Sequence, residues 1–191
     1  MQSLLVMTVL GQDRPGLVDS VADVIARHGG NWQESRMARL GGQFAGILRV
    51  SVPAEQRGLL EQALADLKRQ GLTVVVHPDV SLARPPGWRL GHLEVVGQDR
   101  PGIVRQIAHA LAEAGANVEE LKSECRSAAM SGEAIFQASF LVALPPDCPL
   151  EPLRQRIEQI AEDLIVDIRF REAPETEQVP EAPAGKGPAG A

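Results

Sequence analysis

The chain has 191 residues and a formal net charge of −6, and 44% of its residues are hydrophobic although only 3% are aromatic. This length suits one large domain or two small ones, with a core built from aliphatic side chains. The acidic balance argues against a protein that binds nucleic acid by itself, because such proteins normally present a basic face to the phosphates.

The first half of the chain predicts six elements in the order strand, helix, strand, strand, helix, strand. Alternating and helical spacings of apolar residues distinguish the two kinds of element. The expected segments are a strand over 3–11, a helix from Pro15 to about Arg27 with Val18, Val21, Ala22 and Ile25 on its apolar side, a strand from Asn31, a strand through Leu48, Val50 and Val52, a helix with Leu60, Ala63, Leu64 and Leu67, and a strand over 72–82.

The second half repeats the first. The hexapeptide GQDRPG stands at 11–16 and again at 97–102, and FAGILRVSVP (44–53) matches FQASFLVALP (136–145). The offset between the halves grows from 86 to 92, which predicts a six-residue insertion near Met130, within SAAMSGEA. A repeat of this length with two copies indicates a tandem domain.

The order β-α-β-β-α-β predicts an α+β fold of two ferredoxin-like units, each an antiparallel sheet with both helices on one face. We expect the first unit at 1–82, a short proline-rich linker at 83–88 and the second unit at 89–171. The segment 172–191 is rich in Pro, Gly and Ala, which predicts a disordered tail.

Each GQDRPG segment joins a strand to the N-terminus of a helix. We expect Gly11 and Gly97 to allow a sharp turn, and Asp13 and Asp99 to accept hydrogen bonds from the helix end. Gly16 and Gly102 would leave backbone N–H groups open to an anion such as a carboxylate. A well-capped turn with no ligand is the alternative, and Arg14 and Arg100 could either clamp a carboxylate or stay solvated or Asp-paired.

A second repeated polar position is Asn31, which recurs as Asn117. An Asn amide accepts from an ammonium group through its oxygen and donates to a carboxylate through its nitrogen. Together with the N–H groups of the loop, it would match a free α-amino acid. The alternative is an Asn that makes only local backbone bonds at the start of a strand.

The stretches GQDRPGLV…HGGNW and GQDRPGIV…AGANV, each set in a βαββαβ unit, resemble ACT domains, and a tandem chain of this length resembles the glycine cleavage system transcriptional repressor family. The resemblance implies regulatory modules that bind amino acids, with sheets paired side by side. The ligand would lie between the first strand-to-helix loop of one unit and the second strand of a neighbouring one. Carried over, the site residues are Asp13, Arg14, Pro15, Gly16, Leu17, Val18 and Asn31, with Asp99, Arg100, Pro101, Gly102, Ile103, Val104 and Asn117.

These expectations favour a non-catalytic regulator that binds a small amino acid, such as glycine or serine, and modulates a protein partner such as a DNA-binding regulator or a metabolic enzyme. A ligand-free adaptor that acts only through protein contacts is the alternative, and the pairing of units also allows a homodimer. The four histidines show no metal-ligand spacing, and Cys125 has no evident base partner. We therefore expect no enzyme activity, no cofactor and no metal site.

The sequence also predicts where the protein resides. No stretch reaches the ~20 apolar residues that a membrane span requires, and the N-terminus lacks the basic and small-residue features of a signal peptide. Two cysteines, Cys125 and Cys148, do not make a disulfide framework. We expect a cytoplasmic protein without direct membrane or nucleic-acid contact.

Overall fold

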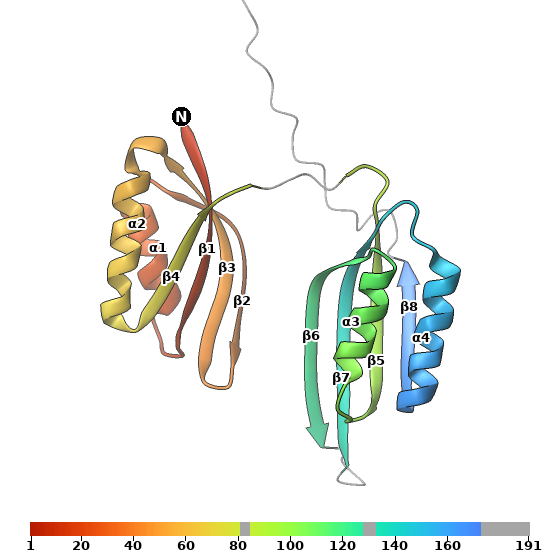
Figure 1. Cartoon of the computed structure of the whole chain (residues 1–191). Helices are drawn as coiled ribbons and strands as arrows, with labels where there is room; N and C mark the ends of the chain where they lie inside the picture. Colours follow the sequence, from red (N-terminus) through yellow and green to blue (C-terminus); the bar gives the residue numbers. More distant parts are fainter. Residues whose placement is uncertain (81–84, 128–132, 173–191) are drawn as a thin grey trace, which may run out of the picture. The chain divides into compact units, whose positions relative to one another are not determined.

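The computed structural model describes residues 1–80, 85–127 and 133–172. The chain divides into two compact units, Met1–Leu82 and Ala83–Ala191. Each unit holds a four-stranded antiparallel sheet with two helices against one of its faces (Figure 1). The predicted α+β fold of two tandem βαββαβ units is therefore confirmed.

The first unit runs β1 (Gln2–Gln12), α1 (Leu17–Arg27), β2 (Asn31–Leu40), β3 (Gln43–Pro53), α2 (Arg57–Asp66) and β4 (Leu72–Pro78). Single turns of 3₁₀ helix, Ala54–Gln56 and Leu67–Gln70, flank α2. The strand order is β2-β3-β1-β4, so that β1 lies between β3 and β4 and β2 forms one edge.

The second unit repeats this arrangement with β5 (Arg89–Gln98), α3 (Ile103–Glu113), β6 (Asn117–Ser127), β7 (Ala134–Leu144), α4 (Leu150–Leu164) and β8 (Val166–Glu172). Its strand order is β6-β7-β5-β8, with the same positions in the sheet as in the first unit. The insertion predicted near Met130 falls largely on residues 128–132, which lie outside the described residues. So do 81–84 and 173–191, and the predicted linker and tail stay predictions.

Each core lies between the helices and one face of the sheet. In β1 the alternate residues Leu5, Met7 and Val9 are at most 1% exposed, and in α1 Leu17, Val21 and Ile25 meet them from the helix side. The second core is equivalent, with Leu93 and Val95 of β5 packed against α3 and α4. Burying each such side chain contributes roughly 1.5–3 kcal/mol. This gain favours a fold in which the apolar side of each strand, every second residue, packs against the apolar side of each helix.

The structure moves some predicted boundaries. Both first helices begin two residues later than expected, at Leu17 and Ile103, because Gly16 and Gly102 have φ values of 86° and 99° and a helix cannot continue through a left-handed residue. The last strands differ from the predicted ones, which are 72–82 in the first unit and, from the segment LIVDIRFR, 164–171 in the second. β4 ends at Pro78, and β8 begins at Val166 because Leu164 closes α4.

The role predicted for Gly11 and Gly97 is wrong. Neither lies in the turn, because both are paired residues inside strands β1 and β5. A Cβ on Gly11 would lie 2.9 Å from the carbonyl oxygen of Gly71, and one on Gly97 would lie 2.6 Å from Cγ1 of Val166. Glycine is required there because the neighbouring strand approaches closely.

Candidate functional site

The two GQDRPG segments form equivalent corners between a central strand and a helix. In each, the proline lies in the turn before the helix, and the glycine after it caps the helix N-terminus in the left-handed conformation. The predicted capping by Asp13 and Asp99 is wrong, since the capping residues are Gly16 and Gly102. Because glycine brings no side chain to accept from the first helical N–H groups, these donors remain available to a ligand or to water.

Asp13 and Asp99 anchor the corners to the sheet. Their backbone N–H groups donate to Gly42 O and Ala134 O, each at 2.9 Å. The Asp13 carboxylate forms an ion pair with Arg39, near the end of β2. In the second unit the residue at this position of the edge strand is Cys125.

Cys125 and Asp99 contact one another at the second corner. Loss of hydration, the negative charge of Asp99 and the hydrogen bond between the thiol and that carboxylate together raise the pKa of the Cys125 thiol. The thiol is therefore mainly protonated and uncharged at neutral pH. Asp99 thus has a neutral group at the strand position where Asp13 has the cation of Arg39, although the six motif residues are identical.

The arginines of the motif also differ between the corners. Arg14 Nη2 donates to the backbone oxygen of Gln70 at 3.0 Å, which holds the first corner against the turn before β4. Arg100 Nη2 donates to Gln98 Oε1 at 3.2 Å. Both contacts are exposed, so both guanidinium groups could turn toward a ligand at little energetic expense.

The apolar members of the predicted site have divided roles. Leu17 and Ile103 are 4% and 2% exposed and belong to the two cores, so only their backbone N–H groups could meet a ligand. Val18 is 45% exposed and Val104 is half-buried, so their side chains could contact one.

Asn31 and Asn117 lie far from the corners of their own units. Asn31 pairs with Ser51, and Ser51 pairs with Leu4 near the start of β1. Asp13 follows the other end of β1, about nine residues or roughly 30 Å further along the chain from Leu4. The second unit has the same layout, with Asn117 at the beginning of β6. One ACT-like unit therefore does not bring the predicted residues together, and a site that uses both groups needs two units.

A β-bulge follows each of these asparagines. The register of the edge strand shifts between Trp32 and Glu34 in the first unit and between Val118 and Glu120 in the second. The extra residue is Glu119 in the second unit, where Asn117 Nδ2 donates to Glu119 Oε1 at 2.9 Å. Bulges commonly redirect side chains beside functional sites. Sequence reasoning missed both bulges. It also missed that Arg39 and Cys125 occupy equivalent positions beside the two corners, although the offset of 86 aligns them.

The described part of the chain contains neither a cluster of metal-ligating side chains nor a helix that could span a membrane. Within residues 1–80, 85–127 and 133–172, no group of three or more His, Cys, Asp or Glu side chains is placed to hold a metal ion. None of the helices in these same ranges combines the length and the apolar character that crossing a membrane requires.

Comparison with known proteins identifies the fold family. The ACT domain family matches residues 3–77 and 93–171, one match for each unit. The chain belongs to the ACT domain family. This confirms the resemblance seen in the two GQDRPG stretches.

Curated relatives of this ACT protein include the glycine cleavage system transcriptional repressors of Escherichia coli and Shigella flexneri. Each is 26% identical over 167 residues, which span 85% of this chain and 86% of the relative. The phosphoserine phosphatase SerB2 of Mycobacterium tuberculosis is 24% identical over 170 residues, but the match spans only 39% of that enzyme.

Solved structures agree with the tandem arrangement. A protein of unknown function from Galdieria sulphuraria has a TM-score of 0.82 and 31% identity, over 91% of this chain and 99% of that one. A candidate glycine cleavage system transcriptional repressor has a TM-score of 0.63 at 20% identity, over 91% of this chain and 98% of that one, and shares the fold.

Proposed function

We propose that this chain is a non-catalytic regulator that binds a small amino acid at composite sites and thereby changes its contact with a protein partner. Each site would join the corner of one ACT unit, with Gly16 or Gly102 at its helix cap, to the beginning of the edge strand of another unit, with Asn31 or Asn117. The observation that carries the proposal is the duplicated corner, whose capping glycine leaves the first N–H groups of a core-anchored helix without a side-chain acceptor.

The chemistry of the two half-sites suits the two ends of an amino acid. The first-turn N–H groups and the positive end of the helix dipole favour the carboxylate. The asparagine oxygen can accept from the ammonium group, and the Asn nitrogen can donate to the carboxylate. A ligand that bridges both half-sites holds two units in one arrangement, so that the ligand and the arrangement stabilise each other.

The size of the ligand limits its affinity. Very small ligands gain at most about 1.5 kcal/mol per non-hydrogen atom, which for a molecule as small as glycine corresponds to a Kd of roughly micromolar order. Such a site would report on an abundant metabolite. A ligand shifts the equilibrium between two arrangements only by its different affinities for them.

The choice of partner follows from charge and relatives. A net charge of −6 is unfavourable for direct binding to DNA, so that control of transcription would act through a DNA-binding protein or a metabolic enzyme. The relatives named as repressors of the glycine cleavage system support glycine and one-carbon metabolism as the context. Glycine and serine are accordingly the first ligands to test.

The proposal is tested by the thermal stability of the full chain with each of the twenty amino acids, followed by calorimetry with the best one. A ligand that binds the native state stabilises it by RT ln(1 + L/Kd) at a free ligand concentration L, so that its Tm rises with the logarithm of that concentration above the Kd. The double variant Gly16→Asn, Gly102→Asn adds an amide that competes for the helix N–H groups, and Asn tolerates positive φ better than other side chains. We expect it to lose binding.

Gly71→Asn is the matched control, because Gly71 has a φ of 79° and open space around a Cβ. This variant also places an Asn at a positive φ, but it blocks no N–H group of a first helical turn, so that binding should persist. Unchanged affinity in the double variant would refute the assignment of the corners. If no amino acid produces a thermal shift or heat, the adaptor alternative replaces the sensor.

A further inference from the structure

The face of the first sheet that points away from its helices exposes several aliphatic side chains. On this face, which we call the open face, Leu4, Leu10, Ile47 and Val75 are 46%, 49%, 56% and 46% exposed. The strand register puts Ile47 beside Thr8 and Thr8 beside Val75, across β3, β1 and β4. These side chains therefore form one continuous surface whose middle lies at Ile47 and Thr8.

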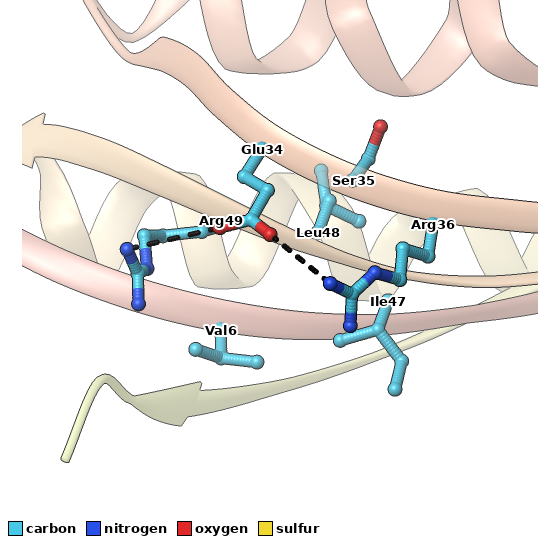
Figure 2. Close-up of a pocket in the computed structure, with 7 residues that line it drawn as sticks. All are labelled: Val6, Glu34, Ser35, Arg36, Ile47, Leu48 and Arg49. Atoms are coloured by element: carbon cyan, nitrogen blue, oxygen red, sulfur yellow. Dashed lines mark ion pairs between the residues drawn. The ribbon is translucent and has the colours of Figure 1, made fainter. Parts of the chain in front are cut away.

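The charged groups of this open face are paired among themselves. Figure 2 shows Glu34 between Arg36 and Arg49, and an arginine nitrogen of each lies 3.9 Å from a Glu34 carboxylate oxygen. Arg49 Nε also lies 3.0 Å from Asp79 Oδ2. Two arginines and two acids leave these four residues with no net charge. Glu34, Arg36 and Arg49 line a depression of about 170 Å³ together with Val6 and Ile47.

The equivalent face of the second sheet has a different character. Where the first sheet has Ile47, Thr8 and Val75, the second has Ser139, Glu94 and Arg169, which adjoin one another in the same way. Lys122 lies beside Ser139 on the edge strand. A face of this composition is stable in water, and covering it with an apolar surface would strip hydration from its charges.

We propose that the open face of the first sheet packs against the same face of a second copy of this chain. Four strands of about ten residues, at ~3.3 Å per residue and ~4.8 Å between strands, present roughly 600 Å². Two such faces bury roughly 1,200 Å², which reaches the lower end of the range for specific, stable interfaces. Sheets that stack in this way lie ~10 Å apart with their side chains interleaved.

The charge balance favours a second copy over other occupants. In a two-fold interface each surface meets itself, so that a net charge on the face would repel its own copy. The neutral set of Glu34, Arg36, Arg49 and Asp79 removes this repulsion. The exposed aliphatic side chains complement the same side chains of a second copy. The charged face of the second sheet does not complement them. The inference does not depend on amino-acid binding.

The test is the mass of the full chain in solution, by sedimentation and light scattering between about 1 and 100 µM. We expect a dimer that Ile47→Glu dissociates, with a dimerisation Kd weakened by at least about 100-fold, because two carboxylates would meet in a desolvated centre. Ser139→Glu is the matched control at the equivalent position of the second sheet, and this variant should remain dimeric. Circular dichroism checks that each variant is folded.

A mixing experiment identifies the self-contact. Because residues near a two-fold axis meet their own copies, equimolar Ile47→Glu and Ile47→Lys should form a dimer that neither forms alone. A monomeric wild type overturns the proposal, as does an Ile47→Glu chain that dimerises like the wild type. If Ser139→Glu also dissociates the dimer, the second sheet takes part in the interface and the proposal is equally wrong.

Discussion

Exchanging Arg39 and Cys125 tests whether the charge of the corner sets its affinity for a carboxylate. Arg39 forms an ion pair with Asp13 at the first corner, whereas Cys125 contacts Asp99 at the second. Arg39→Cys gives the first corner the composition of the second, and Cys125→Arg does the reverse. We expect the first change to weaken amino-acid binding at its corner and the second to strengthen it.

The size of the effect follows from Coulomb's law in a solvated site. If the ligand carboxylate binds roughly 7 Å from the Arg39 guanidinium, the unit charge contributes about 0.6 kcal/mol at the dielectric constant of water, or about a threefold change in Kd. The Arg39 side chain is 69% exposed, so the larger values that apply to buried pairs do not hold here. Screening by 1 M salt shortens the Debye length to about 3 Å and should abolish the difference.

Isothermal titration calorimetry at low and high salt measures both Kd values. Arg156→Cys is the control, since Arg156 lies on the exposed surface of α4, where it donates to Gln159 Oε1. It changes the net charge of the chain by the same amount at a residue outside both GQDRPG segments and their ion pairs, and it should leave the Kd within error. If Arg39→Cys tightens binding, or if its effect survives 1 M salt, the electrostatic reasoning about the corners is wrong.

Three further predictions concern the fold and the second corner. Gly97→Ala should lower the free energy of unfolding by about 1–3 kcal/mol, because its Cβ would lie 2.6 Å from Val166, and urea unfolding would show a lower midpoint at an unchanged m-value. Ile165→Asn should raise it by about 0.5–1 kcal/mol and increase Tm, since Ile165 has a φ of 55° and is 67% exposed; an unchanged or lower Tm would contradict this. Asp99→Asn should lower the pKa of the Cys125 thiol by removing a nearby negative charge, which shifts the pH profile of iodoacetamide alkylation to lower pH, and a profile that stays in place would exclude this contact.

Most of the fold could be predicted because its signals are local and duplicated. Alternation in β1 and helical spacing in α1 are properties of a few consecutive residues, and the same pattern recurs 86 positions later. Each copy supports the interpretation of the other. The helix starts were misplaced because Pro15 is compatible with both a turn and a first helical residue, and only the φ of Gly16 decides between them.

The details of the site depended on contacts that sequence spacing does not encode. Gly11 is a glycine because of Gly71, some 60 residues away, and Asp13 is held by Arg39 on an edge strand. An acid before a helix commonly caps it. Asp13 instead pairs with Arg39, a partner that only the tertiary fold brings close. The separation of Asn31 from Asp13 likewise follows from the sheet order, which places them at opposite ends of β1.

That separation gives the composite site its sharpest test, by amide exchange. Ligand binding should slow exchange of the first-turn N–H groups of α1 and α3, because these donors become hydrogen-bonded to the carboxylate. The double variant Asn31→Ala, Asn117→Ala should lose this protection with ligand present and keep wild-type exchange without it, although each Asn lies roughly 30 Å from the corner of its own unit. Only a ligand shared between two units links such distant groups. If the corners stay protected by ligand in this variant, each corner binds its ligand alone, and the pairing of units has no part in recognition.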